Sequence, residues 1–167
     1  MKTILFQGDS ITDYRRNREE IFGEMGYGYP NLVNAYLGME YPNEYKFINR
    51  GVGGNRIVDL YARIKQDFIN IKPDYASVYV GVNDTWLDIL GAKNGVDTVK
   101  FEKIYTMLID EVKEACPDIK LILISPFVLE GEATCNTENY PKRLEQILTD
   151  RCRRKTLHTP YICQDPR

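Results

Sequence analysis

The stretch TILFQGDSIT, residues 3–12, joins a short apolar run to a glycine, an acid and a serine. A short apolar run bounded by turn residues predicts a buried β-strand. Gly8 and Asp9 favour a turn, and a serine in such a place often caps a helix. The stretch alone therefore leaves two alternatives for Ser10, a nucleophile at the end of a strand or a helix cap.

The composition limits the classes of protein to which the chain can belong. The chain has 167 residues, of which 43% are apolar and 28% charged, and these values suit a single domain with its own core. The net charge of −2 gives no overall basic field, so nucleic acid is not an expected partner. No segment approaches the roughly 18 apolar residues of a membrane span. The apolar stretch at residues 4–6 is also far too short for a signal peptide. We therefore expect no membrane partner and a cytoplasmic location.

Metal and cofactor sites are not expected. The four cysteines, at positions 116, 135, 152 and 163, have no Cys-x-x-Cys spacing, and the sequence has a single histidine. A Cys/His zinc site is therefore disfavoured, and free thiols are the expected state in the cytoplasm. The turn after the first predicted strand lacks a glycine-rich phosphate cradle, which argues against a nucleotide-binding domain.

Strands and helices alternate along the predicted structure. Apolar runs predict strands at residues 3–6, 45–49, 75–82 and 119–125, and the last two suit strands buried on both faces. Amphipathic patterns predict helices at residues 29–38, 56–72 and 99–116, and a further helix that begins at Asn139. Gly38 is the expected end of the first of these helices. This order indicates an α/β fold with a parallel sheet and helices on both faces.

Polar or glycine-rich segments follow each predicted strand. They are GDSIT at residues 8–12, NRGVGGNR at 49–56, GVNDTW at 81–86 and PFVLEGE at 126–132. Ligands of such folds bind beyond the carboxyl ends of the strands, so these segments are expected to meet.

Three of these segments carry groups that suit acyl transfer, which needs a nucleophile and donors aimed at an oxyanion. Ser10 supplies a hydroxyl, the glycines of residues 51–54 let a backbone N–H approach closely, and Asn83 offers an amide. Each group taken singly has a structural alternative as a cap or a turn. Their joint occurrence at three successive strand ends favours acyl transfer.

These three motifs, in this order and spacing, resemble those of the SGNH hydrolases, also called the GDSL esterase/lipase family, over residues 1 to about 150. The resemblance implies a flavodoxin-like three-layer α/β/α sandwich. It implies that Ser10 is the nucleophile and that the Ser10 N–H, the Gly54 N–H and the Asn83 amide form the oxyanion hole. NDTW, which contains Trp86, and PFVL are similar to the bacterial branch with carbohydrate acetylesterases. We expect Asp9 and Trp86 to line the substrate site, with core packing as the alternative for Trp86.

The general base of the family is not found in its usual form. The family has an Asp-x-x-His motif near the C-terminus, whereas KTLH, residues 155–158, places Lys155 where the Asp is expected. A lysine cannot accept the imidazole N–H and disfavours the imidazolium. His158 is therefore either the base or a tail histidine without a catalytic role.

The last residues differ in character from the rest. Residues 151–167 hold five Lys or Arg and one acid, and the expected final strand and helix are incomplete. We therefore divide the chain into a hydrolase domain at 1–150, incomplete at its C-terminus, and an atypical basic tail at 151–167. We hypothesise that a truncation or a change of reading frame near residue 150 separates this sequence from the family pattern.

Two functions follow from these observations. The first is a serine-type esterase that releases short acyl groups, such as acetyl, from a small-molecule or oligosaccharide ester. The second is a catalytically inactive remnant or binding module that keeps the cleft without the base. Neither function requires a metal or cofactor, and the sequence does not predict the oligomeric state. We expect the charged segment from Arg15 to Glu20 to be a solvated or lid-like loop. We expect Asp13 and Asp84 to bond local backbone, with contact to the substrate as the alternative.

Overall fold

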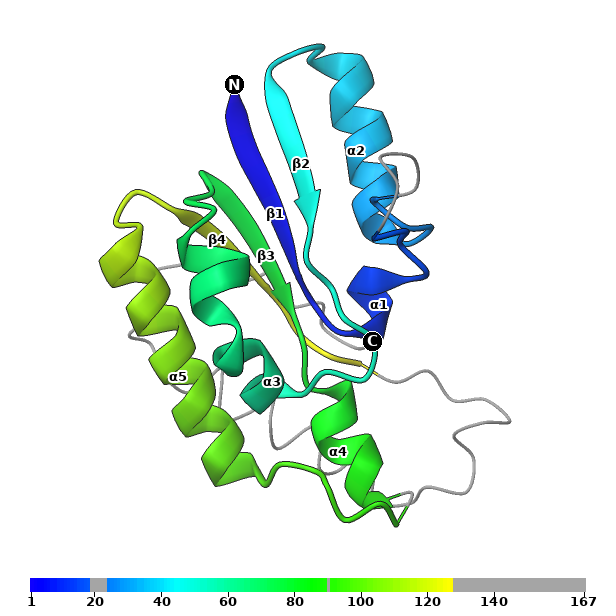
Figure 1. Ribbon diagram of the computed structural model, residues 1–167, viewed down its shortest axis with the longest axis vertical. Helices are drawn as coiled ribbons and strands as arrows, with labels where there is room; N and C mark the ends of the chain where they lie inside the picture. The colour runs from blue at the N-terminus through cyan, green and yellow to red at the C-terminus, as the bar shows by residue number, and fades with distance from the viewer. Residues whose placement is uncertain (19–23, 90, 128–167) are drawn as a thin grey trace, which may run out of the picture.

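The computed structural model describes residues 1–18, 24–89 and 91–127 (Figure 1). In chain order the elements are β1 (Lys2–Gly8), α1 (Ser10–Asp13), α2 (Tyr29–Glu40), β2 (Tyr45–Asn49), α3 (Ile57–Ala62), the π-helix η1 (Lys65–Ile69), β3 (Tyr75–Tyr79), α4 (Val82–Ile89), α5 (Thr98–Ala115) and β4 (Lys120–Ile124). In this part of the chain, no helix is both long and apolar enough to cross a membrane.

The four strands form one parallel sheet in the order β2-β1-β3-β4. In the register of the sheet, Phe6 pairs with Asn49, and Gly8 pairs with Tyr79. The carboxyl ends of β1, β2 and β3 therefore lie next to one another, as the sequence predicted. This end of the sheet is where the candidate site is built.

Helices cover both faces of the sheet (Figure 1). Because successive side chains of a strand point to opposite faces, Leu5 and Val78 lie on one face and Phe6 and Tyr79 on the other. The first face packs in the main core with α3 and α5, to which Leu60 and Leu108 belong. The second face meets α2, whose Tyr29 ring contacts both Phe6 and Tyr79. The predicted parallel α/β architecture with helices on both faces is thus confirmed.

The structure corrects the bounds of three predicted elements and the predicted burial of a fourth. Gly38 does not end its helix, because α2 continues to Glu40. The helix predicted over residues 56–72 is divided into α3 and η1. The strand predicted over residues 75–82 ends at Tyr79, and Val82 begins α4. In β4 only one face is covered by described residues, since Leu121 is 4% exposed but Ile122 is 45% exposed.

Gly8 is required where β1 turns into α1. A Cβ atom at this position would overlap the Tyr79 backbone carbonyl and the Thr12 hydroxyl. The same residue pairs with Tyr79 in the sheet, so neither neighbour is free to withdraw without disturbing a strand or a helix. The glycine of the GDS motif therefore lets the serine turn approach β3 closely.

Two glycine substitutions should have opposite effects on the free energy of unfolding. Gly8→Ala forces a methyl group into closely packed backbone, and we expect a loss of about 1–3 kcal/mol. Gly38→Ala lies in the exposed interior of α2, where no atom of the described part of the chain is within 4 Å of the added Cβ, and we expect a gain of about 0.5–1 kcal/mol. Urea unfolding of both variants measures the difference. Equal effects would contradict the packing described for Gly8.

Candidate active site

The serine turn leaves the Ser10 hydroxyl on the surface. Asp9 is the N-cap of α1, and its Oδ1 accepts a hydrogen bond of 3.0 Å from the Ile11 N–H. The Asp9 N–H donates to the Tyr79 carbonyl over 3.3 Å, which ties the turn to the end of β3. Ser10 is the first residue of α1 and is exposed. The capping alternative for Ser10 is therefore wrong, because Asp9 performs that role.

The loop after β2 is fixed to α1 by the side chain of Asn49. This amide is fully buried and donates to the carbonyls of Thr12, at 2.7 Å, and Met25, at 3.1 Å. Its Oδ1 accepts a hydrogen bond of 2.8 Å from the Gly51 N–H. A Cβ atom on Gly51 would overlap the backbone of Asp13, so the loop touches α1 at this glycine. Asn49 carries no local sequence signal for this role, because its partners come from other segments.

The glycines of this loop lie beside the serine. The Cβ position of Gly53 is 3.9 Å from the Ser10 Cβ, which places the loop next to the hydroxyl. Gly54 has a φ of +80°, a conformation that side chains disfavour, and no atom of residues 1–18, 24–89 or 91–127 lies within 4 Å of its Cβ position. The loop backbone at Gly54 is therefore open to an approaching ligand.

Asn83 lies on the other side of the same loop. It is in the first turn of α4, and its Nδ2 donates to the Asn55 carbonyl over 3.0 Å. The Oδ1 of the adjacent Asp84 accepts a hydrogen bond of 3.0 Å from the Ile57 N–H, at the start of α3. The loop at residues 51–56 is thus held between α1 and α4. The structure brings Ser10 and Asn83 to the loop that carries Gly54.

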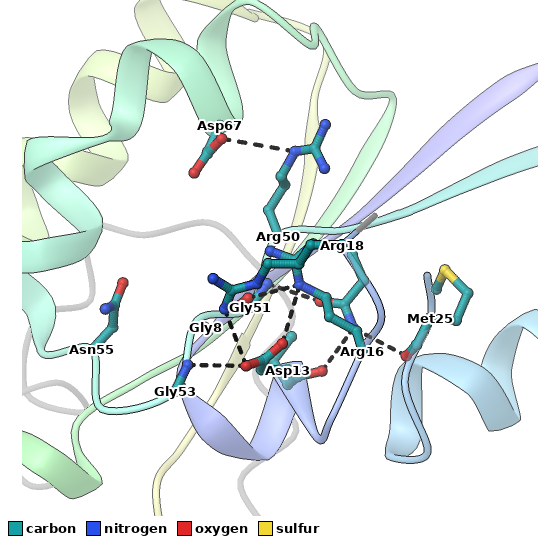
Figure 2. A network of polar contacts seen from close by, with 12 residues as sticks. Gly8, Asp13, Arg16, Arg18, Met25, Arg50, Gly51, Gly53, Asn55 and Asp67 are labelled. Atoms are coloured by element: carbon teal, nitrogen blue, oxygen red, sulfur yellow. Dashed lines mark hydrogen bonds and ion pairs between the residues drawn. The ribbon is translucent and has the colours of Figure 1, made fainter. Parts of the chain in front are cut away.

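Asp13 is the centre of a polar network at the surface of the loop (Figure 2). Its carboxylate accepts a hydrogen bond of 3.2 Å from the Gly53 N–H and forms ion pairs with Arg16 and Arg18 at 3.2 and 3.3 Å. Arg16 also donates to the Gly51 carbonyl over 2.9 Å, and its side chain is only 7% exposed. The expectation of a solvated loop is therefore wrong at Arg16, which is part of the scaffold.

Arg63 binds the same region from the side of α3. Its guanidinium donates to the carbonyls of Arg50, at 2.8 Å, and Gly8, at 3.3 Å. It also contacts the Asn55 Oδ1 at 2.9 Å and the Asp67 carboxylate at 2.7 Å. One side chain thus joins the end of β1 to the loop after β2. Local sequence patterns gave no signal for this role, because its partners are up to 55 residues away.

Asp9 and Asp84 are two buried carboxyls near the candidate site. The sequence predicted that Asp9 lines the substrate site. Asp9 has no exposed surface, so its side chain packs beneath the serine turn and does not line the open site. Burial raises the pKa of Asp9 to about 6, against the lowering effect of the Ile11 N–H. Burial raises the pKa of Asp84 to about 7, and the nearby Asp9 carboxylate adds to that rise. Both groups act on the scaffold, as expected for Asp84.

The remaining predicted residues divide into two groups. Trp86 is half-buried on α4, three positions after Asn83. His158, Lys155, the helix predicted from Asn139 and the basic tail at 151–167 lie outside the described residues, as does most of PFVLEGE. Within the described ranges, no three His, Cys, Asp or Glu side chains gather into a group that could hold a metal ion.

The fold and the motifs at its strand ends define a class of α/β hydrolytic protein, and comparison with known proteins gives the family. The model of the GDSL-like lipase/acylhydrolase family matches residues 6–162, so the chain belongs to that family. It is 39% identical over 137 residues to an acetylxylan esterase of Geobacillus stearothermophilus. That alignment covers 77% of this chain and 61% of the esterase, so the chain spans less than two thirds of this curated relative.

Solved structures give the same result. Axe2, an acetylxylan esterase from Geobacillus stearothermophilus, superposes with a TM-score of 0.71 at 33% identity, over 89% of this chain and 72% of that one. LAE5, an α/β hydrolase enzyme from the metagenome of Lake Arreo in Spain, superposes with a TM-score of 0.72 at 27% identity, over 89% of this chain and 73% of that one. The resemblance to the SGNH family that the motifs suggested is confirmed.

The free energy of unfolding should fall as the pH rises from about 5 to about 7. In the unfolded chain Asp9 and Asp84 titrate near 3.8, so at about pH 5 they are ionised there but protonated in the native state. Each such proton contributes up to about 1.4 kcal/mol per pH unit, and stability is greatest at the acid end of this window. Urea unfolding at several pH values measures the slope.

The matched variants for that pH experiment are Asp9→Asn and Asp84→Asn. Each keeps an oxygen acceptor for the capped N–H but cannot titrate, so each should remove one proton from the slope. A wild-type stability that is flat across this window would contradict the raised pKa values.

Removal of the Asn49 amide should destabilise the protein strongly. Asn49→Ala leaves the Thr12 and Met25 carbonyls and the Gly51 N–H without their buried partner. Each unsatisfied buried group costs about 1–3 kcal/mol, so we expect a loss of at least about 2 kcal/mol in urea unfolding. Asn70→Ala, at an exposed position, is the matched control and should change stability by less than about 0.5 kcal/mol. Similar losses in the two variants would contradict the role of Asn49.

Proposed function

We propose that this chain is a serine-type esterase that hydrolyses short acyl esters, with acetyl groups on oligosaccharides as its substrate class. The observation that supports the proposal most directly is the arrangement around the loop at residues 51–56. This loop lies next to the exposed Ser10 on one side and is bonded to Asn83 on the other, while its Gly54 stays open. Acyl transfer requires a nucleophile and oxyanion donors around one point.

In the proposed mechanism Ser10 attacks the ester carbonyl carbon and passes its proton to a general base, for which His158 is the candidate. The oxyanion accepts hydrogen bonds from the Ser10 N–H, the Gly54 N–H and the Asn83 amide. The C–O bond to the alcohol then breaks, the base returns the proton to the leaving alcohol, and an acyl-serine remains. Water attacks this acyl-serine, releases the acid and restores the Ser10 hydroxyl.

Asn83 is suited to this role because an amide nitrogen carries two hydrogens. One of them is used in the bond to the Asn55 carbonyl, which fixes the side chain in one orientation. The second is available for the oxyanion. A donor that is held in place before the reaction loses no freedom in the transition state, and one such donor contributes about 3–4 kcal/mol.

The substrate class rests on the relatives. The curated relative is an acetylxylan esterase, and one matching solved structure is described as an acetyl-xylooligosaccharide esterase. We infer that acetylated xylo-oligosaccharides are the first substrates to test. Trp86 is the proposed contact for the sugar, since an indole ring provides a flat apolar surface close to Asn83.

A second candidate function, a binding module without turnover, is favoured by one observation. Lys155 stands at the position where the family's Asp-x-x-His motif has its acid. Without a carboxylate the imidazole of His158 is neither oriented nor stabilised as an imidazolium. A chain with an intact oxyanion hole and no effective base would bind an acetylated sugar and hydrolyse it very slowly.

Turnover of p-nitrophenyl acetate and of acetylated xylo-oligosaccharides separates the two functions. An esterase should lose at least about 1,000-fold in kcat on Ser10→Ala, because the nucleophile is gone while binding remains. Thr106→Ala, which removes a hydroxyl on α5, is the matched control and should keep the wild-type rate. Equal background rates in wild type and Ser10→Ala would contradict the esterase. A rise in melting temperature with the acetylated sugar under those conditions would support the binding module.

A further inference from the structure

Asp84 is a buried carboxyl that the proposed mechanism does not use. It follows Asn83 directly in the chain and has no exposed surface. Its Oδ1 accepts the 3.0 Å hydrogen bond from the Ile57 N–H. Its Oδ2 is buried and has no hydrogen-bond partner in the part of the chain that the structure describes. A carboxyl that is kept in such surroundings needs an explanation, because a buried polar group without a full set of partners is costly.

The Asp84 bond is one of two that join the first turn of α4 to the residues after Gly54. The second is the bond from the Asn83 Nδ2 to the Asn55 carbonyl. These two bonds run in opposite directions, since α4 accepts at Asp84 and donates at Asn83. The Asp84 carbonyl also accepts a hydrogen bond of 2.8 Å from the Val96 N–H, which fixes the other side of the turn. Gly54 and Asn83 are thus held at a set spacing.

We propose that Asp84 is a positioning residue for the oxyanion hole, because its bond to the Ile57 N–H holds the Gly54 segment against the helix that carries Asn83. The inference rests on the proposed function, in which Gly54 and Asn83 donate to the oxyanion. Gly54 is exposed and has a positive φ, and among the described residues no atom lies within 4 Å of its Cβ position, so side-chain contacts at that position do not hold it. Its position depends on the anchors on either side, which include Asp13 at Gly53 before it and Asn83 and Asp84 after it.

The surroundings of Asp84 make this positioning depend on pH. Burial raises the pKa of Asp84 to about 7, the Asp9 carboxyl of the serine turn adds to the rise, and Arg56 opposes it. The Arg56 guanidinium is itself held by Asp59 and by Asn94. Above about pH 7 Asp84 is ionised, and a charged acceptor makes a shorter and stronger bond to an N–H than a neutral one. The hydrogen bond that holds the Gly54 segment against α4 therefore becomes stronger as the pH rises.

The first test does not depend on turnover. In the ¹⁵N-labelled full chain, the amide proton of Ile57 should shift downfield with a midpoint near pH 7, as the carboxyl that it donates to becomes charged. The shift should be absent in Asp84→Asn, which reproduces the neutral acid. An Ile57 amide that does not titrate, or one that titrates equally in Asp84→Asn, overturns the proposal. An absence of turnover in the wild type overturns the proposed function and leaves this test intact.

The second test uses kinetics. Asp84→Ala, which removes the acceptor, should lower kcat by about 10–100-fold and change KM by less than about threefold, because an oxyanion donor acts in the transition state. Asp84→Asn should restore kcat to the wild-type value near pH 6 and should show a smaller increase at higher pH than the wild type, because only the titration of the general base remains. If Asp84→Ala does not fold, this Asn variant still decides the matter. A kcat of Asp84→Asn with the wild-type pH profile overturns the proposal.

The matched control is Asp97→Ala. Asp97 is the N-cap of α5, and its Oδ1 accepts a 3.0 Å bond from the Lys100 N–H, which is the same kind of bond at another helix start. This variant should lower the melting temperature and leave kcat and its pH profile unchanged. A decrease in kcat equal to that of Asp84→Ala would show that the effect is general destabilisation, and it would overturn the positioning role.

Discussion

The buried side chain of Asn49 is the interaction on which the rest of the candidate site depends. A parallel sheet brings the ends of β1 and β2 together but leaves the loops beyond them free to take many conformations. Asn49 removes that freedom, because one amide donates to α1 and to residue 25 and accepts from Gly51 in the loop. Because Asn49 pairs with Phe6 in the sheet, the backbone that carries this amide is held in place. The loop therefore contacts the serine turn in a single conformation.

Charged side chains around the loop also hold its backbone in place. Asp13, Arg16 and Arg63 each form hydrogen bonds with backbone groups of the loop or of the end of β1, so they support loop backbone that has no regular structure of its own. Glycines at positions 8 and 51 permit the close approach that these bonds need. The polar anchors and the close contacts reinforce each other, since each bond requires the short distance that the glycines allow.

The parallel sheet with helices on both faces, and the meeting of polar segments at the carboxyl ends of its strands, followed from local patterns in the sequence. Apolar runs alternate with amphipathic segments, and turn residues end each strand. The anchors of the loop did not follow from such patterns. Asn49 was predicted only to lie at the end of a strand, and no role was predicted for Arg63 within the helix at residues 56–72. Their partners come from distant segments, and Asp9 was expected at the surface because a motif does not show which carboxyl is buried. Gly38 was expected to end a helix, but an exposed glycine costs too little to stop one.

In the proposed active site, Ser10, Gly54 and Asn83 surround a single point at the end of the sheet. The most direct measurement is a crystal structure of the protein after reaction with a p-nitrophenyl alkylphosphonate, whose serine adduct imitates the tetrahedral intermediate. The account predicts phosphorus on the Ser10 Oγ, and a phosphonyl oxygen about 2.7–3.1 Å from the Ser10 N, the Gly54 N and the Asn83 Nδ2. An adduct on another residue, or a phosphonyl oxygen that points away from Gly54 and Asn83, would contradict it.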